Sequence, residues 1–306
     1  MGEALAAAYP EARATFAEAD AAFDRHAAAA GGRTLTEIMW QGPEDQLRLT
    51  EIAQPALLAV STAASRVLAA QGLQPSFVAG HSLGEYSANV AAGTFTFADG
   101  IRVVQRRGRY MQEAVPVGQG AMAAILGSDP ETVRRACNEA AEGDVVSPAN
   151  INGHGQVVIA GTVKAVQRAS ERAKALGAKR AVPLQVSAPF HCALMLPAEA
   201  RLEPELRDLA AEAPRVPVVA NVDAKIKREA WAAIDALVQQ VSAPVRWEEV
   251  VQRLAKEGVT TYVEVGPGTV LSGLVKKIHK DARVIHFGSP QDLAAVVSAC
   301  SISTEK

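Results

Sequence analysis

A serine lies between two glycines in the segment "VAGHSLGEYSA" at residues 78–88. The run "SFVAG" before it predicts a short strand, and "LGEYSANVAAG" after it predicts a helix that ends at Gly93. A serine on a sharp strand-to-helix turn presents its hydroxyl as a nucleophile. Because a hydroxyl attacks only with a base and with donors for the resulting oxyanion, Ser82 predicts an acyl-transfer or hydrolytic site, with the N–H of Leu83 as one donor.

The base would come from one of six histidines, which are His26, His81, His154, His191, His279 and His286. We favour His191, in "VSAPFHCALM", because it follows directly after a predicted small lobe and so lies at the junction of two lobes. Glu85 falls in the first turn of the helix after Ser82. An acid suits the positive end of a helix dipole, so we interpret Glu85 as a helix-capping residue.

Arg107 lies within the apolar face of a helix predicted over residues 98–115. The residues that share this face at the 3.6-residue period are Ile101, Val104, Gly108, Met111 and Val115. The opposite, solvated stripe consists of Arg102, Arg106, Arg109 and Glu113. An arginine on a buried face needs an anion. Two interpretations stay open: an internal ion pair, or a guanidinium that binds a substrate carboxylate through two hydrogen bonds.

The middle of the chain predicts a small lobe over residues 117–187. Its predicted elements are the strand "AMAAILG", the helix "DPETVRRACNEAAE" with Asp129 as its cap, the strands "VVSPANI" and "QVVIAG", the helix "TVKAVQRASERAKALG" and the strand "AKRAVPLQV". This βαββαβ order is that of a ferredoxin-like unit. We expect it to be inserted into a larger lobe.

The flanking residues 1–116 and 188–306 predict that larger lobe. Short β-branched runs, "VPVVANV", "TTYVEVG" and "RVIHF", alternate with helical patterns such as "EAWAAIDALVQQV". This alternation predicts an α/β fold with a mostly parallel sheet covered on both faces. Ligands of such sheets bind at the carboxyl ends of the strands, where the turn at Ser82 would lie.

The composition is that of an ordinary globular protein. The 306 residues are 49% hydrophobic and 21% charged, and the net charge of −2 gives no basic field for nucleic acid. Three scattered cysteines predict neither a disulfide framework nor a metal site. No signal peptide is evident, and the apolar run at residues 54–72 contains Arg66, so we expect a buried helix, no membrane span and a cytoplasmic protein.

Five segments together resemble one family, the bacterial malonyl-CoA:acyl carrier protein transacylases. They are "GHSLGEYSA", "RRGRYMQEAVPVGQGAMAAI", "SAPFHCALM", "PVVANVD" and "YVEVGPGTVLSGLVKKI", and the resemblance runs from about residue 1 to about residue 285. It implies an α/β-hydrolase-like lobe with an inserted ferredoxin-like lobe. It also implies ping-pong transfer of malonyl from malonyl-CoA to the phosphopantetheine thiol of acyl carrier protein, without a cofactor. We expect a monomer.

The resemblance assigns roles to individual residues. Ser82 matches the acylated serine, His191 its base, Arg107 the partner of the malonyl carboxylate and Leu83 the oxyanion donor. Gln240, which the residues alone would place on a helix surface, matches a glutamine whose main-chain carbonyl orients the histidine. We further expect two residues at the substrate: Met111, and Phe190, which would crowd a methyl branch.

One departure from the family pattern concerns the start of the sequence. Family members begin with a buried strand and a loop of the type G-Q-G-S-Q, whose first glutamine supplies a second oxyanion N–H. Neither appears in the sequence, so we expect a weakened enzyme, since one lost oxyanion donor costs about 2.7–4 kcal/mol.

Three alternatives remain at this point. A serine hydrolase would use Ser82, Asp235 and His286, in the chain order of the α/β-hydrolases. A discrete acyltransferase that loads a polyketide synthase carrier would share every catalytic residue. A carrier-protein-binding protein without catalysis would leave Ser82 unacylated by malonyl-CoA.

Overall fold

The computed structural model describes residues 1–186 and 188–301 and begins with a run of helices. These are α1 (Glu3–Ala8), α2 (Pro10–Ala22), α3 (Leu35–Gln41), α4 (Glu44–Leu47) and α5 (Thr50–Ala70). By length and composition α5 could cross a membrane, yet 67% of its apolar window is buried inside the protein. It packs against α2 and α7, so its apolarity serves the core, as the sequence predicted.

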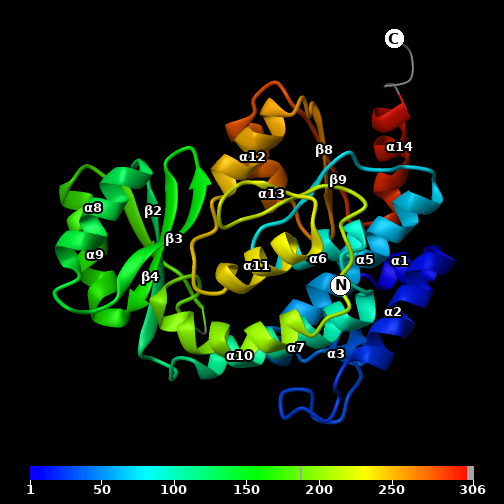
Figure 1. Ribbon diagram of the computed structural model, residues 1–306, viewed down its shortest axis with the longest axis horizontal. Helices are drawn as coiled ribbons and strands as arrows, with labels where there is room; N and C mark the ends of the chain where they lie inside the picture. Colours follow the sequence, from blue (N-terminus) through cyan, green and yellow to red (C-terminus); the bar gives the residue numbers. More distant parts are fainter. Residues whose placement is uncertain (187, 302–306) are drawn as a thin grey trace.

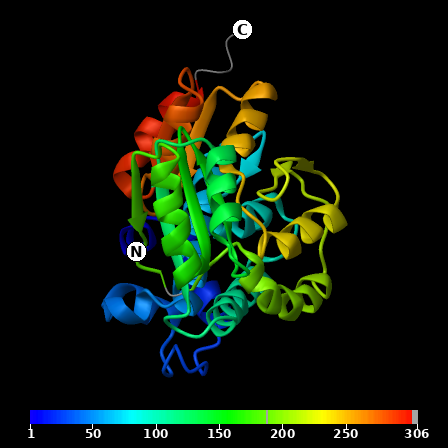
Figure 2. The same cartoon turned by 90° about the vertical axis from the view of Figure 1, so that its left-hand side faces the viewer.

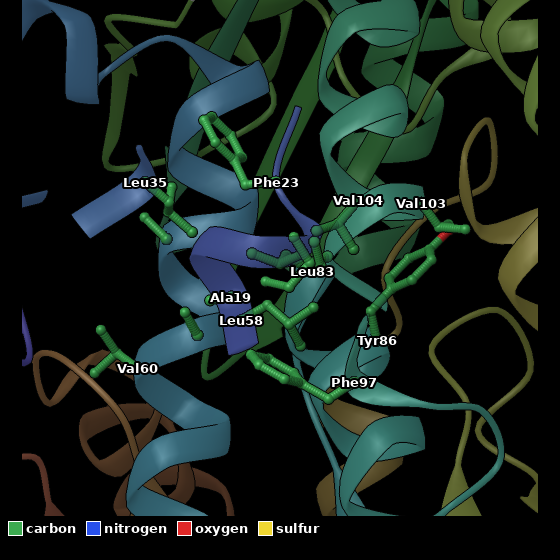
Figure 3. Close-up of a cluster of buried hydrophobic side chains, with 14 of the residues drawn as sticks. Ala19, Phe23, Leu35, Leu58, Val60, Leu83, Tyr86, Phe97, Val103 and Val104 are labelled. Carbon is green, nitrogen blue, oxygen red and sulfur yellow. The ribbon is translucent and has the colours of Figure 1, made fainter. Parts of the chain in front are cut away.

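The predicted strand, turn and helix around Ser82 are present. β1 (Val78–Ala79) leads through the turn into α6 (Leu83–Ala92), and Gly93, at a φ of 75°, ends the helix as predicted. α7 (Phe97–Glu113) follows and packs along α5. Figure 3 shows the shared core of these helices, in which Leu58 of α5, Leu83 and Tyr86 of α6 and Phe97 of α7 converge.

The large lobe has short strands and many helices. β1 pairs in parallel with β6 (Val218–Val219), β6 pairs antiparallel with β7 (Ile226–Lys227), and β8 (Thr261–Val265) pairs in parallel with β9 (Arg283–Phe287). Its later helices are α10 (Leu196–Arg207), α11 (Ala230–Gln240), α12 (Trp247–Lys256), α13 (Val270–Ile278) and α14 (Leu293–Ser301), with 3₁₀ turns at Ala193–Met195 and Pro290–Asp292. The predicted α/β class with mostly parallel pairing is confirmed, although the run at residues 216–222 is paired over two residues only.

The small lobe has the predicted βαββαβ order. Its elements are β2 (Gly120–Leu126), α8 (Pro130–Ala140), β3 (Val146–Gly153), β4 (Gln156–Thr162), α9 (Val163–Ala175) and β5 (Arg180–Pro183). The sheet order is β3-β4-β2-β5 with antiparallel pairs throughout, and both helices cover one face of it (Figures 1 and 2). The side chain of Asp129 accepts a hydrogen bond from the N–H of Thr132 and so caps α8 as expected.

The two lobes meet beside Ser82. The N–H of Ile151 in β3 donates to the carbonyl of Val245, and the N–H of Val245 donates to the carbonyl of Ala149. These bonds join the small sheet to the segment between α11 and α12. The predicted end of the small lobe at residue 187, and the last five residues of the predicted large lobe, lie outside the described residues.

Gly108 allows α7 to lie directly on α5. A Cβ at this position would stand 2.5 Å from the carbonyl oxygen of Thr50, which is backbone and cannot turn away. We therefore expect Gly108→Ala to lower the free energy of unfolding by about 1–3 kcal/mol, the usual effect of overpacking. Chemical denaturation measures this. Gly273→Ala in α13, where a Cβ meets open space, is the control. Equal stability of the two variants would contradict this view of the α5–α7 contact.

Candidate active site

Ser82 occupies a strained turn between β1 and α6. Its φ is 52° and its ψ is −109°, a backbone conformation that non-glycine residues rarely adopt. The turn is sharp because β1 and α6 almost touch: a Cβ on Gly80 would lie 2.0 Å from the carbonyl carbon of Gly84. This close approach is the physical reason for a glycine at position 80, whereas a Cβ on Gly84 would meet no atom within 4 Å.

Asn221, which the sequence analysis did not single out, holds this turn in place. Its Oδ1 accepts from the N–H of Ser82 at 2.7 Å, and its Nδ2 donates to the carbonyl of Gly80 at 2.7 Å. The side chain is buried and comes from the segment after β6, the strand that pairs with β1. A strained residue persists only where its surroundings over-determine its backbone, and Asn221 supplies that restraint.

His191 bonds the serine hydroxyl. Its Nε2 lies 2.7 Å from Ser82 Oγ, and its Nδ1 lies 2.9 Å from the carbonyl oxygen of Gln240. Since a carbonyl only accepts, the proton of a neutral ring sits on Nδ1 and Nε2 is left free to accept from the serine. His191 itself has a φ of 61°, so both members of the pair lie on strained backbone.

The environment keeps this imidazole neutral. His191 is 3% exposed, and burial, with the nearby Arg107 guanidinium as the second cause, lowers its pKa from 6.5 to about 3. Both effects disfavour the imidazolium. At neutral pH the ring is therefore uncharged, with Nε2 facing the serine hydroxyl.

Arg107 lies on the buried face of α7, as predicted, and is 2% exposed. Its Nη1 donates to Gln54 Oε1 at 2.7 Å, and its Nη2 donates to Gln240 Oε1 at 2.9 Å and to Ser82 Oγ at 3.2 Å. The guanidinium carbon lies 5.1 Å from the centre of the Tyr86 ring. Burial lowers the pKa of Arg107.

Arg107 has no carboxylate partner within 4.0 Å anywhere in residues 1–186 and 188–301, and its Nε has no hydrogen-bond partner there. The internal ion pair that the sequence left open is therefore absent from the described chain. The second interpretation remains, in which a buried cation beside a nucleophile receives an anion from the substrate.

Gln240 is wholly buried, not a surface residue as its sequence pattern alone indicated. Its main-chain carbonyl accepts from His191, and its side-chain Nε2 donates to the carbonyl of Ser82 at 3.0 Å and to Glu85 Oε2 at 2.7 Å. With Oε1 bonded to Arg107, this one residue contacts the nucleophile, the base and the buried cation. The helical periodicity of its segment could not predict these contacts, because the partner residues lie far away in the chain.

Glu85 is 1% exposed, and the capping role expected from its place in α6 is wrong. Its carboxylate accepts from the N–H of Asn221 at 2.9 Å and from Gln240, not from the N–H groups of its own helix. Burial raises the pKa of Glu85 to about 7, partly offset by these two donors.

The other predicted residues lie around this cluster. The N–H of Leu83 opens α6 and donates to no acceptor in the described part of the chain. Met111 is buried one turn beyond Arg107, and its Sδ accepts from Gln54 Nε2 at 3.9 Å. Phe190, next to His191, is half-buried where the cores of the two lobes meet.

His81 and the hydrolase residues Asp235 and His286 bond groups other than the Ser82 hydroxyl. His81 Nε2 is 2.9 Å from Asn152 Oδ1, which ties the turn to the small lobe. Asp235 pairs with Arg207 at the surface, and His286 Nε2 is 2.8 Å from the carbonyl of Gly266. Asp235 and His286 thus have other partners, and the hydrolase arrangement is not assembled in the structure.

Two surface pockets lie away from the cluster around Ser82. One, of about 450 Å³, is lined by residues such as Arg66, Phe97 and Arg215, and the other, of about 530 Å³, includes Asp129 and His154. Neither contains Ser82, so the geometry and charge of the side chains, not hollow size, mark the site. No group of three or more His, Cys, Asp or Glu side chains in the described chain is arranged to hold a metal ion.

Comparisons with known proteins agree with one another. A family model described as "Acyl transferase domain" matches residues 1–299. The malonyl CoA-acyl carrier protein transacylase of Escherichia coli K12 is 50% identical over 294 residues, which cover 96% of this chain and 93% of that protein.

Solved structures show the same likeness. An acyl carrier protein S-malonyltransferase from Vibrio cholerae superposes with a TM-score of 0.92 at 46% identity, covering 97% of this chain and 94% of its own. A malonyl-transacylase solved in complex with a type II PKS acyl-carrier protein gives a TM-score of 0.92 at 47% identity, covering 98% and 94%.

The neutral state of His191 is testable by NMR. We expect the ring to remain neutral, with its single proton on Nδ1, from pH 8 down to about pH 4, and His191→Ala identifies the signals. Because the folded pKa lies below the unfolded one, the folded state binds fewer protons, and this residue's contribution to stability is lost as pH falls from about 6.5 toward about 3. A ring that titrates near pH 6.5 in the folded protein would contradict the buried geometry.

Proposed function

Because the chain belongs to the acyl transferase domain family, we propose that it transfers malonyl from malonyl-CoA to the phosphopantetheine thiol of an acyl carrier protein. The observation that carries this proposal is the buried Arg107 guanidinium, without a carboxylate partner in the described chain and 3.2 Å from Ser82 Oγ. A substrate with a free carboxylate on the acyl group supplies the missing charge. A malonyl thioester has that chemistry.

Ser82 is the nucleophile of the first half-reaction. His191 Nε2 takes the hydroxyl proton as Oγ attacks the thioester carbonyl, and the Gln240 carbonyl holds the ring through Nδ1–H while it is charged. The Leu83 N–H, at the positive end of α6, stabilises the oxyanion. Collapse of this intermediate expels CoA, which leaves with the proton held by His191, and the malonyl group remains as an ester on Ser82.

The second half-reaction reverses these roles. The carrier's thiol gives its proton to His191, attacks the malonyl-serine carbonyl and leaves as the malonyl thioester, while the proton returns to Ser82. An ester is exchanged for a thioester with no change of oxidation state, so the residues named supply all the chemistry and we assign no cofactor.

Selectivity follows from the buried charge. Acetyl-CoA would leave the guanidinium unpaired in a desolvated site, whereas malonyl satisfies it through charge-assisted hydrogen bonds. Gln54 accepts from Arg107 Nη1 and donates to Met111 Sδ, and these bonds limit where the guanidinium can lie. Phe190 adjoins the base and disfavours a branched malonyl group.

The carrier protein is the macromolecular partner in this proposal. The segment 275–280 exposes Lys276, Lys277 and Lys280, which have no acidic partner within 4.0 Å among the described residues, whereas Arg102 and Arg106 pair with Asp99 and Glu205. The lysine segment is therefore the better surface for an acidic carrier. We further propose a monomer that acts in the cytoplasm, without nucleic-acid or membrane partners.

A second candidate differs only in the carrier. One similar malonyl-transacylase was solved with a type II PKS acyl-carrier protein, so a carrier of that class is a further candidate substrate for this chain. Malonyl transfer to the two carriers in competition, followed by mass spectrometry, distinguishes them.

Arg107→Ala is expected to lower kcat/KM for malonyl-CoA on the order of 10²–10³-fold, which corresponds to about 3–4 kcal/mol for a lost buried charge pair. The same change is expected to spare or increase acylation by acetyl-CoA. Intact mass after incubation with each thioester measures both. A parallel loss with both substrates would show that Arg107 supports the fold and does not select the carboxylate.

His191→Ala is expected to slow the malonylation of Ser82 by about 10²–10⁴-fold, the usual contribution of a general base. His286→Ala is the matched control, because its ring bonds Gly266 on another sheet and should leave the rate unchanged. Ser82→Ala should show no adduct. A hydrolase that uses His286 predicts the opposite ranking of the two histidine variants.

A further inference from the structure

The cluster around Gln240 contains two buried opposite charges that do not touch. Arg107 Nη2 donates to Gln240 Oε1 at 2.9 Å, and Gln240 Nε2 donates to Glu85 Oε2 at 2.7 Å. Because a guanidinium only donates and an ionised carboxylate only accepts, the amide has one orientation between them. One side-chain amide therefore separates the guanidinium from the nearest carboxylate.

This placement makes Glu85 the only carboxylate in the described chain that shares a hydrogen-bonded partner with Arg107. Both side chains are almost fully buried, so the field between them is weakly screened. In the unacylated protein an ionised Glu85 balances the charge of Arg107 through the amide. A substrate carboxylate on Arg107 would add a second negative charge to the same desolvated cluster.

We propose that Glu85 is a positioning residue that takes up a proton when a malonyl carboxylate binds Arg107, so that one negative charge faces the guanidinium in both states. The inference rests on the proposed malonyl transfer and extends it. Ionised Glu85 balances Arg107 before the substrate arrives, and protonated Glu85 keeps a hydrogen-bonded place beside Gln240 afterwards. The base-orienting carbonyl and the cation thus keep their geometry through the cycle.

Among the titratable groups of this cluster, Glu85 is the one that can take up the proton. The charged or titratable groups near it include Arg107 on α7, Asp223 after β6 and Tyr86 on its own helix. His191, which bonds the Gln240 carbonyl, has a pKa lowered to about 3 by burial and therefore stays neutral. Asp223 is paired with Lys227 at 2.7 Å, and burial holds the pKa of Tyr86 at about 12, so this phenol is already protonated.

The described charged side chains of α5 and α11, two other elements packed against α6, lie beside charged partners of their own. Asp235 of α11 pairs with Arg207, and Arg66 of α5 pairs with Glu18. Glu51, at the start of α5, is partly buried near Arg109. The carboxyl of Glu85, whose pKa of about 7 is set by burial, changes protonation in the neutral range, and a second anion nearby would raise that pKa further.

The proton balance of acylation makes the inference measurable. The Ser82 proton passes through His191 to the CoA sulfur, so the covalent step itself consumes no proton. The small ionisation of the released thiol is the same for every variant. With a free-state pKa of about 7, uptake by Glu85 should approach about three quarters of a proton per malonyl at pH 7.5.

The experiment acylates the full chain with stoichiometric malonyl-CoA in weak buffer containing a pH indicator, and intact mass counts the adducts. Wild type should take up this proton, and Glu85→Gln, which keeps an acceptor oxygen, should lose the uptake. Glu264→Gln is the control: Glu264 likewise accepts two N–H···O bonds, both from backbone groups, those of Leu271 and Ser272, but it has no hydrogen-bonded link to Arg107. It should retain the uptake.

A pH series on wild type tests the inference without any variant. Uptake should fall below about one tenth of a proton at pH 5.5, where Glu85 is protonated before and after acylation. An adduct without proton uptake at pH 7.5, or equal uptake by wild type and Glu85→Gln, overturns the role of Glu85 and leaves the malonyl transfer standing. An absent adduct on wild type overturns the proposed function itself.

Discussion

The burial of the Arg107 guanidinium without an adjacent carboxylate is the constraint on which the rest of the site depends. Removing a charge from water costs several kcal/mol even after relaxation, so a fold tolerates it only with good partners. Arg107 has Gln54 and Gln240 as acceptors and the Tyr86 ring beneath it, all of them neutral. The guanidinium can therefore bind an anionic group of the substrate.

The same charge sets the state of its neighbours. It disfavours a proton on His191, which keeps the imidazole neutral, and it favours the ionised form of Glu85 against the effect of burial. Gln240 connects the three, because its carbonyl holds the histidine while its amide lies between the cation and the carboxylate. The charge states of His191, Arg107 and Glu85 are therefore coupled, and the arrival of a substrate carboxylate affects all three.

Strain at the nucleophile depends on a second set of contacts. Ser82 and His191 both have positive φ, and the 2.7 Å contact between them exists because the Ser82 backbone and the His191 ring are each held by a residue distant in the chain. Asn221 holds the serine turn and the Gln240 carbonyl holds the imidazole. The short pairing of β1 with β6 matters for this reason: it brings Asn221, 139 residues further on, to the amide of Ser82.

Sequence patterns predicted the features that depend on residues close together in the chain. The glycines around Ser82, the end of α6 at Gly93, the Asp129 cap and the βαββαβ order followed from residue types and periods, and the burial of Arg107 followed from the face of its helix.

Only the tertiary structure decided what surrounds the nucleophile. The position in a helix gave the wrong role for Glu85 and, taken alone, for Gln240, and it gave no indication of Asn221. Their partners lie 49–158 residues away, and no helical or strand period extends across such a separation. The family resemblance indicated the Gln240 carbonyl and, among six histidines, His191. Only the tertiary structure showed that the Gln240 side-chain amide lies between Arg107 and Glu85, because this arrangement depends on the burial of all three side chains.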